Sequence, residues 1–201
     1  MASDHYFTPS PGSELRLRPL EVTIAGSPRS LQTAGGIFSP DAIDAGTAIL
    51  LAAVPAPPAT GDLIDVGCGW GPMALTLALL SPEARVWAVD VNERALDLVR
   101  LNSERLGLTN VTASLPHEVP ADIRFAALWS NPPIRVGKAE LHDILETWLP
   151  RLDDGADAHL VVAKHLGADS LQRWLGETLP DDFTVTRQSN SKGYRILRVR
   201  R

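Results

Sequence analysis

The fold of this chain is decided by residues 62–71, with the sequence DLIDVGCGWG, and by Pro72 directly after them. Residues 63–66 form a short apolar run, which predicts a buried strand. The strand ends in a glycine-rich turn. Pro72 then suits the first position of a helix, because the N–H that proline lacks has no helical partner there. A strand, a tight glycine turn and a helix N-terminus together predict a cofactor site at the end of the strand.

The glycine spacing and a nearby acid indicate which cofactor this is. Gly67, Gly69 and Gly71 follow the pattern G-x-G-x-G, whereas a dinucleotide site has G-x-G-x-x-G and would need glycine where Pro72 stands. The carboxylate of Asp65 beside the turn would repel a pyrophosphate. It would attract a ligand with positive charge, such as the amino group and sulfonium of S-adenosylmethionine.

A second acid supports the same cofactor. The next predicted strand ends in Asp90, 23 positions after Gly67. An acid at this place can accept hydrogen bonds from both ribose hydroxyls. The alternative, a tight turn in an α/β domain without a nucleotide, leaves Asp65 and Asp90 unexplained. We therefore predict that S-adenosylmethionine binds here and leaves as S-adenosyl-L-homocysteine, with no metal site.

Composition limits the class of protein. The 201 residues are 44% hydrophobic and 21% charged, as in a globular protein, and we expect one domain over residues 1–201. The longest apolar run, 48–54, is too short to span a bilayer, and the N-terminus has no signal-peptide pattern. The single cysteine, Cys68, cannot form an internal disulfide. We therefore expect a cytoplasmic protein that binds no membrane, as a monomer or weak dimer.

The charge distribution leaves one question open. The net charge of −5 argues against a surface coated for nucleic acid. Residues 185–201, however, contain no acid and several basic side chains, namely Arg187, Lys192, Arg195, Arg198, Arg200 and Arg201. This segment either grips phosphates near the site or forms a solvated edge of the sheet.

Strands alternate with helices along the chain, which predicts an α/β fold with a doubly wound, Rossmann-like sheet. The core, 61–201, follows a small N-terminal β-hairpin and helix within 1–54. The hairpin is expected between residues 15 and 33, the helix over 41–53, and a turn at 153–155. The seven core strands are expected over 61–66, 85–90, 110–114, 125–130, 157–163, 183–188 and 194–199, the last two as an antiparallel hairpin. The core helices are expected over 72–80, 93–106, 138–149 and 168–178.

The sequence Ser130-Asn131-Pro132-Pro133-Ile134 follows the fourth core strand. Because strand order reverses in a doubly wound sheet, strands one and four are neighbours and Asn131 faces the cofactor. The prolines remove two N–H donors, which leaves the Asn131 side-chain oxygen and the Pro132 carbonyl as acceptors for the hydrogens of an NH2 group. Two such bonds would direct the nitrogen lone pair at the methyl group, without a covalent intermediate.

These motifs resemble the class I S-adenosylmethionine-dependent methyltransferases of the small-domain type. More narrowly, the chain is similar to the 16S ribosomal RNA guanine-N2 methyltransferases, as a single-domain member. The narrower resemblance rests on further segments, namely His5-Tyr6-Phe7, Gly36-Ile37-Phe38-Ser39, Asp44-Ala45-Gly46-Thr47, Arg135-Val136-Gly137-Lys138, Val162 to Ala168 and Lys192-Gly193-Tyr194-Arg195.

The resemblance implies roles for individual residues. Asn131 to Ile134 would be the catalytic motif, with Ile134 where many related enzymes have an aromatic residue that stacks on the base. The residues implied for cofactor binding are Asp65, Gly67 and Gly69 at the methionine end, Asp90 at the ribose with Val91 after it, Phe38 and Thr47 closing the site, and Asn131. Near the adenine amino group, a backbone group or Ser114 would replace the acid that is often found there.

The resemblance also implies a substrate. The expected reaction is methyl transfer to the N2 amine of a guanine in ribosomal RNA, with the small ribosomal subunit as partner. Three alternatives stay open: a protein glutamine-N5 methyltransferase, an adenine-N6 methyltransferase, and an RNA chaperone that binds the cofactor without catalysis. The intact Asn131 speaks against the last of these.

Overall fold

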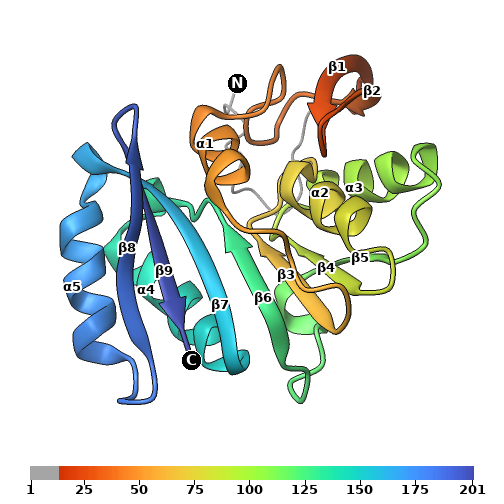
Figure 1. Ribbon diagram of the computed structural model, residues 1–201. Helices are drawn as coiled ribbons and strands as arrows, with labels where there is room; N and C mark the ends of the chain where they lie inside the picture. The colour runs from red at the N-terminus through yellow and green to blue at the C-terminus, as the bar shows by residue number, and fades with distance from the viewer. Residues whose placement is uncertain (1–13) are drawn as a thin grey trace.

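The computed structural model describes residues 14–201. At its centre is a seven-stranded sheet with the order β5-β4-β3-β6-β7-β9-β8, in which only β9 runs opposite to the others (Figure 1). The strands are β3 (Asp62–Val66), β4 (Arg85–Val89), β5 (Val111–Ser114), β6 (Phe125–Ser130), β7 (Leu152–Ala163), β8 (Thr184–Ser191) and β9 (Tyr194–Arg200). The predicted fold, including the antiparallel C-terminal hairpin, is confirmed.

Helices cover both faces of the sheet, because alternate residues of each central strand point to opposite sides. Leu63 of β3 packs beneath α1 (Ala45–Ala53), α2 (Pro72–Leu80) and α3 (Glu93–Arg105). Its neighbour Ile64 belongs to a second cluster, beneath α4 (Lys138–Trp148) and α5 (Ala168–Thr178). Among residues 14–201, no helix is both long and apolar enough to cross a membrane.

The order of the strands creates a crevice at the end of β3. Val66 at this end pairs with Val89 of β4 on one side and with Ser130 of β6 on the other. The chain therefore leaves β3 and β6 at the same edge but toward different helical layers, which is where open α/β sheets bind ligands. The expected adjacency of the glycine turn and Asn131 is confirmed.

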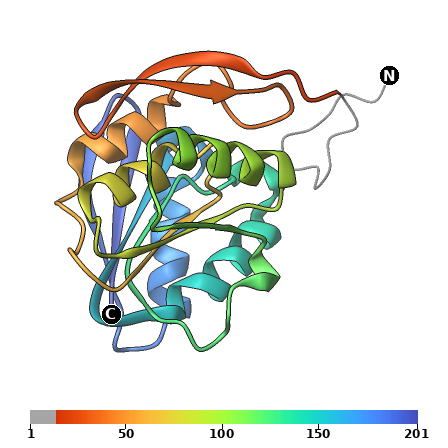
Figure 2. The same cartoon turned by 90° about the vertical axis from the view of Figure 1, so that its right-hand side faces the viewer.

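The N-terminal extension packs on the core. Strands β1 (Arg18–Ile24) and β2 (Ser27–Thr33) form an antiparallel hairpin that lies over α2 and α3 (Figure 2). Leu20 and Leu31 face each other in this hairpin and are buried in the same cluster as Trp70. The indole N–H of Trp70 donates to the carbonyl of Ser39 at 3.1 Å, which joins the glycine turn to the extension.

Two boundaries in the N-terminal extension differ from those expected. The first helix begins at Ala45, not at residue 41, because the Asp44 carboxylate caps it by accepting from the Gly46 and Thr47 N–H groups at 2.8 and 3.3 Å. The first strand begins at residue 18, not at 15.

The turn predicted at 153–155 is wrong, because this segment lies within β7. The register there jumps from Phe125 opposite Leu152 to Ala127 opposite Asp157, which is a bulge. Gly155, with φ of +78°, provides the bend. Its N–H donates to the Arg201 carbonyl at 2.7 Å, so the bulge is joined to residue 201 after β9.

Candidate functional site

The glycine turn lies flat against the end of β4. Gly67, Gly69 and Gly71 have φ angles of +76°, +55° and +98°, in the left-handed region that side chains rarely adopt. The N–H groups of Gly67 and Cys68 both donate to the Val89 carbonyl, at 2.8 and 3.0 Å. These two amides are thus engaged, and the turn presents to the crevice a backbone without side chains at Gly67 and Gly69.

Asp65 lies beneath this turn and is buried. Its carboxylate accepts from the N–H of Ala74, in the first turn of α2, at 2.9 Å. Desolvation raises the pKa of Asp65 to about 8, the Ala74 N–H opposes this shift, and the charge of Asp90 adds to it. A carboxyl group in this state gains its charge most easily when a cation comes beside it.

Asp90 connects the ends of β4 and β3. One oxygen accepts from the Gly69 N–H and the other from the Asn92 N–H, both at 2.9 Å. Burial raises the pKa of Asp90, and these N–H groups partly offset the effect. Because each carboxylate oxygen has two acceptor positions, Asp90 can still accept hydrogen bonds from a pair of hydroxyls.

A cavity of about 350 Å³ opens beside the turn, within the range of small-molecule sites. Its walls come from the N-terminal extension, the ends of β3, β4, β6 and β7, and α4. They are formed by Phe38, Asp44, Val66, Gly67, Gly69, Val89, Asp90, Val91, Asn92, Ala95, Pro116, Asn131, Pro132, Pro133, Ile134, Arg135, Val136, Glu140, Ile144, Trp148, Ala163, His165, Leu166 and Tyr194.

Most predicted site residues line this cavity, and two more lie next to it. A narrow pocket beside the cavity, which shares Gly67, Gly69 and Asn131 with it, reaches Asp65 and Thr47.

Ser114 is the exception. It is buried and lines neither the cavity nor the narrow pocket, and its hydroxyl lies 3.4 Å from a carboxylate oxygen of Glu118. Pro116, two residues further on, lines the cavity instead.

Asn131 is held by the N-terminus of α1. Its side-chain Nδ2 donates to Oδ2 of Asp44 at 2.9 Å and lies 3.2 Å from the hydroxyl oxygen of Thr47. Because a carboxylate can only accept, this contact determines which end of the amide faces Asp44. The side-chain oxygen of Asn131 is thereby directed away from α1, free to accept.

The two prolines shape the backbone after Asn131. The N–H of Ile134 donates to the Pro132 carbonyl at 2.8 Å, and Pro133 between them has φ of −75° and ψ of 73°. This is an inverse γ-turn, whose φ the proline ring imposes. The Pro132 carbonyl therefore already accepts one hydrogen bond within the chain. One of its two lone pairs is engaged, and the other remains available to a ligand.

Several wall residues were not predicted as site residues. Asp44 is the most informative, since only the resemblance pointed to its segment and it is both the cap of α1 and the partner of Asn131. Tyr194 packs so closely on Gly46 that a Cβ there would stand 3.0 Å from a Tyr194 ring carbon. The segment His5 to Phe7 lies outside the described residues.

A family model described as "Methyltransferase small domain" matches residues 29–198. The chain belongs to this family. Membership makes it a methyltransferase that uses S-adenosylmethionine, and the predicted family and cofactor are confirmed. Which residues bind the cofactor stays a prediction.

Relatives differ in how much they say about the substrate. "Uncharacterized protein YbxB" of Bacillus subtilis is 32% identical over 202 residues, 99% of each chain. Ribosomal RNA small subunit methyltransferase C is 37% identical in Aeromonas hydrophila, over 59% of this chain and 34% of the relative. The Salmonella typhi protein of that name is 29% identical, over 85% and 50%. This chain thus spans a third to a half of the relatives named for an activity.

One solved structure resembles the chain closely in fold. It is the T. thermophilus 16S rRNA N2 G1207 methyltransferase in complex with AdoMet and guanosine, with a TM-score of 0.75 over 94% of this chain and 52% of that one. The sequences are 21% identical, so this likeness shows the fold alone.

Proposed function

We propose that this protein transfers a methyl group from S-adenosylmethionine to the exocyclic N2 amine of a guanine in small-subunit ribosomal RNA. One observation carries the proposal: the Asn131 amide is held through Nδ2 by Asp44, at 2.9 Å, and its oxygen is left to accept. Asn131 lines the cavity beside the glycine turn. Its side-chain oxygen can therefore accept a hydrogen bond from an N–H or O–H group of a ligand in that cavity.

The residues of the cavity fit the cofactor. A Cβ added to Gly67 would stand 4.0 Å from Pro133, which is van der Waals contact. Because glycine has no Cβ, a gap remains between the glycine turn and the Asn-Pro-Pro turn. Asp65 would face the ammonium group and Asp90 the ribose hydroxyls. Val91 and Pro116 offer apolar walls for the adenine, while Phe38 and Thr47 would close the methionine end.

The chain's own groups would position the amine for attack. The cofactor supplies an electrophilic methyl group on a sulfonium. The Asn131 oxygen and the second lone pair of the Pro132 carbonyl accept the two N–H groups of the amine, which localises the nitrogen lone pair. A nitrogen–carbon bond would form as the sulfur–carbon bond of the cofactor broke, and the cationic nitrogen would then lose a proton to water. Alignment of the three atoms supplies the rest of the acceleration.

The choice of small-subunit ribosomal RNA rests on the relatives, and that of guanine N2 on the resemblance of the motifs. Ribosomal RNA small subunit methyltransferase C matches up to 85% of this chain, and its substrate class is the one the resemblance implied. Partner and location follow from the substrate, namely the small ribosomal subunit in the cytoplasm. Ile134 lines the cavity and packs against the core, so its place is compatible with an apolar contact to the target base.

The test is transfer of a radiolabelled methyl group to three acceptors in parallel: undermethylated small ribosomal subunits, their naked RNA, and a protein extract. Label recovered as N2-methylguanine after digestion of the RNA is the expected result. Label in N6-methyladenine or in protein glutamine would overturn the assignment of the substrate and leave the assigned cofactor site standing.

A further inference from the structure

Four cations lie on segments that follow the carboxyl ends of the strands, and each either lines the cavity or is within two residues of one that does. Arg135 lies in the turn after β6, Lys138 begins α4, Lys164 follows β7, and Lys192 lies in the β8–β9 turn. They include all three lysines of the chain. We call them the rim cations. All four are exposed, and none forms an ion pair with another described residue.

The segments that carry them meet at one place. The N–H of Lys164 donates to the Gly193 carbonyl at 2.8 Å, which joins the end of β7 to the turn that contains Lys192. Arg135 and His165 line the same cavity from the segments that follow two neighbouring strands, β6 and β7. Within residues 131–138, 164–168 and 189–195 there is no acidic residue, although the whole chain has a net charge of −5.

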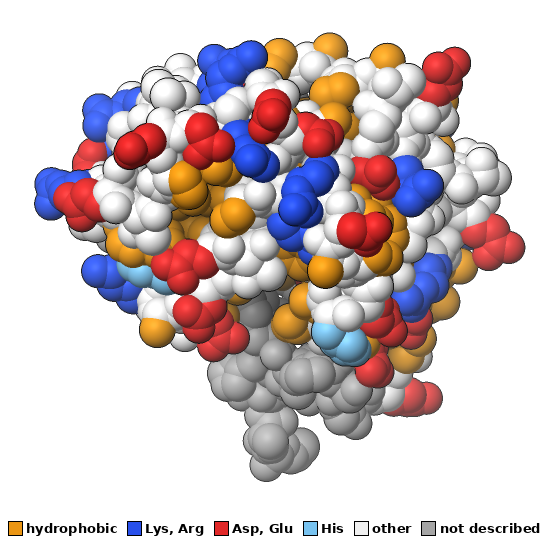
Figure 3. Space-filling model, turned by 90° about the horizontal axis from the view of Figure 1, so that it is seen from below, with side chains coloured by type: hydrophobic (Ala, Val, Ile, Leu, Met, Phe, Trp, Pro, Cys, Tyr) orange, Lys and Arg blue, Asp and Glu red, His pale blue; other side chains and the backbone are white. Residues whose placement is uncertain are grey.

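The arginines of the C-terminal segment that lie at the other end of the sheet are paired with acids. Arg198 and Arg200 both contact Asp157, at 2.8 and 3.3 Å, and Arg201 lies within 3.3 Å of Asp154. Figure 3 views the molecule from this end, where the parallel strands begin, and there Lys and Arg side chains are interspersed with Asp and Glu. The basic C-terminal segment is therefore divided, and most of its cations do not face the cavity.

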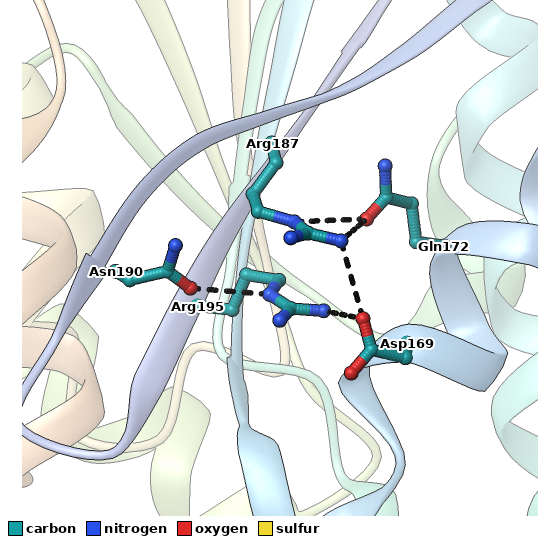
Figure 4. A network of polar contacts seen from close by, with 5 residues as sticks. All are labelled: Asp169, Gln172, Arg187, Asn190 and Arg195. Atoms are coloured by element: carbon teal, nitrogen blue, oxygen red, sulfur yellow. Dashed lines mark hydrogen bonds and ion pairs between the residues drawn. The ribbon is translucent and has the colours of Figure 1, made fainter.

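Two further arginines of that segment have a structural role. Arg195 is nearly buried and contacts Asp169 and Asn190, while Arg187 contacts Asp169 and Gln172 (Figure 4). This network ties β8 and β9 to the first turn of α5, directly after the segment that begins with Lys164. It fixes that segment and leaves the neighbouring lysines to the solvent.

We propose that the rim cations form one surface that binds the phosphates of the RNA strand carrying the target base. This inference rests on the proposed function, because it takes RNA as the substrate. Because the rim cations form no ion pair within the described protein, binding of phosphate to them breaks none. The arginines of the C-terminal segment at the other end of the sheet would first have to break an ion pair with an aspartate. Binding by four cations around the cavity also places the strand where the Asn131 oxygen can reach a base.

The inference predicts a salt dependence. Each phosphate contact with a single strand contributes about 0.7 to the slope of log K against log salt. Replacement of the three lysines by glutamine (K138Q/K164Q/K192Q) should therefore lower the slope for small-subunit ribosomal RNA by about 2. Arg135 stays unchanged in this variant, because it lines the cavity.

A matched control carries the same change in charge at the other end of the sheet. Arg85, Arg105 and Arg124 are exposed and lie at the start of β4, the end of α3 and just before β6. Filter binding of radiolabelled naked RNA at several salt concentrations, without methyl transfer, compares K138Q/K164Q/K192Q with R85Q/R105Q/R124Q. The expected result is a reduced slope and weaker binding for the lysine variant alone, with cofactor binding unchanged in both.

Equal slopes in the two variants would overturn the inference, because binding would then depend on net charge and not on this surface. An unchanged slope in the lysine variant would overturn it too. Neither result would bear on the proposed function, which is read from the methylated nucleoside and not from RNA affinity.

Discussion

Removal of the Asp44 carboxylate is expected to lower the rate of methyl transfer strongly and the free energy of unfolding only slightly. In Asp44→Ala, Asn131 keeps only the hydroxyl of Thr47, at 3.2 Å, as a partner for its amide. A hydroxyl can donate as well as accept, so the Thr47 hydroxyl alone does not determine which end of the Asn131 amide faces the cavity.

The two effects can be estimated separately. A hydrogen bond to a charged group contributes about 1.5–3 kcal/mol. If the Asn131 orientation loses this free energy, the rate of transfer falls about 10- to 100-fold, since about 1.4 kcal/mol is a factor of ten. Loss of the helix cap costs about 1 kcal/mol, which for a chain of this size lowers the melting temperature by about 2–4 °C.

The assay is a single-turnover measurement with saturating S-adenosylmethionine, together with a melting curve. Asp44→Asn is the matched control, because asparagine caps helices as well as aspartate does but forms only a neutral bond to Asn131. We expect a smaller loss of rate for this control. Transfer by Asp44→Ala at the rate of the unaltered protein would refute the role given to Asp44.

Three further predictions follow from the site. Gly71→Ala should lower the free energy of unfolding by at least about 2 kcal/mol, because residue 71 has φ of +98° and a Cβ would stand 3.0 Å from Val99. Denaturant unfolding measures this loss, which should be smaller for Gly107→Ala, where φ is +69° and the space around the residue is open. Gly46→Ala should lower the transfer rate, because its Cβ would stand 3.0 Å from both Asp44 and Tyr194; single-turnover kinetics equal to those of the unaltered protein would contradict this. With a pKa of about 8, Asp65 holds a proton at pH 7 in the free protein. Because a bound ammonium group favours the carboxylate, cofactor affinity should rise from pH 6 to 8, and calorimetry in two buffers should detect proton release on binding. Proton uptake, or an affinity that does not change with pH, would exclude the contact between Asp65 and the ammonium group.

Local patterns were enough to predict the sheet and to bring the glycine turn and Asn131 to one edge of it. The helix over 72–80 and the helix over 168–178 begin and end where expected, because proline and glycine mark their ends in the sequence. The neighbouring positions of the glycine turn and Asn131 followed from strand order in doubly wound sheets. These features depend on periodicity and on residues close together in the chain.

The parts that were missed depend on contacts between distant residues. The bond from Asn131 to Asp44 spans 87 positions, and no periodic pattern indicates it. The bulge at Gly155 depends on a partner at the last residue of the chain. The place of Ser114 near the adenine was implied by the resemblance alone, and its hydroxyl contacts two groups close to it in the sequence, the Leu115 carbonyl and the Glu118 carboxylate.

The most direct test of the site is methyl transfer by Asn131→Ala, measured in a single turnover on undermethylated small ribosomal subunits, with cofactor affinity measured on the same preparation. Loss of the acceptor should lower the rate at least about 100-fold, as for removal of one group that stabilises a transition state. Cofactor affinity should stay within a few-fold. Transfer at nearly the unaltered rate would contradict the central claim that Asn131 holds the amine.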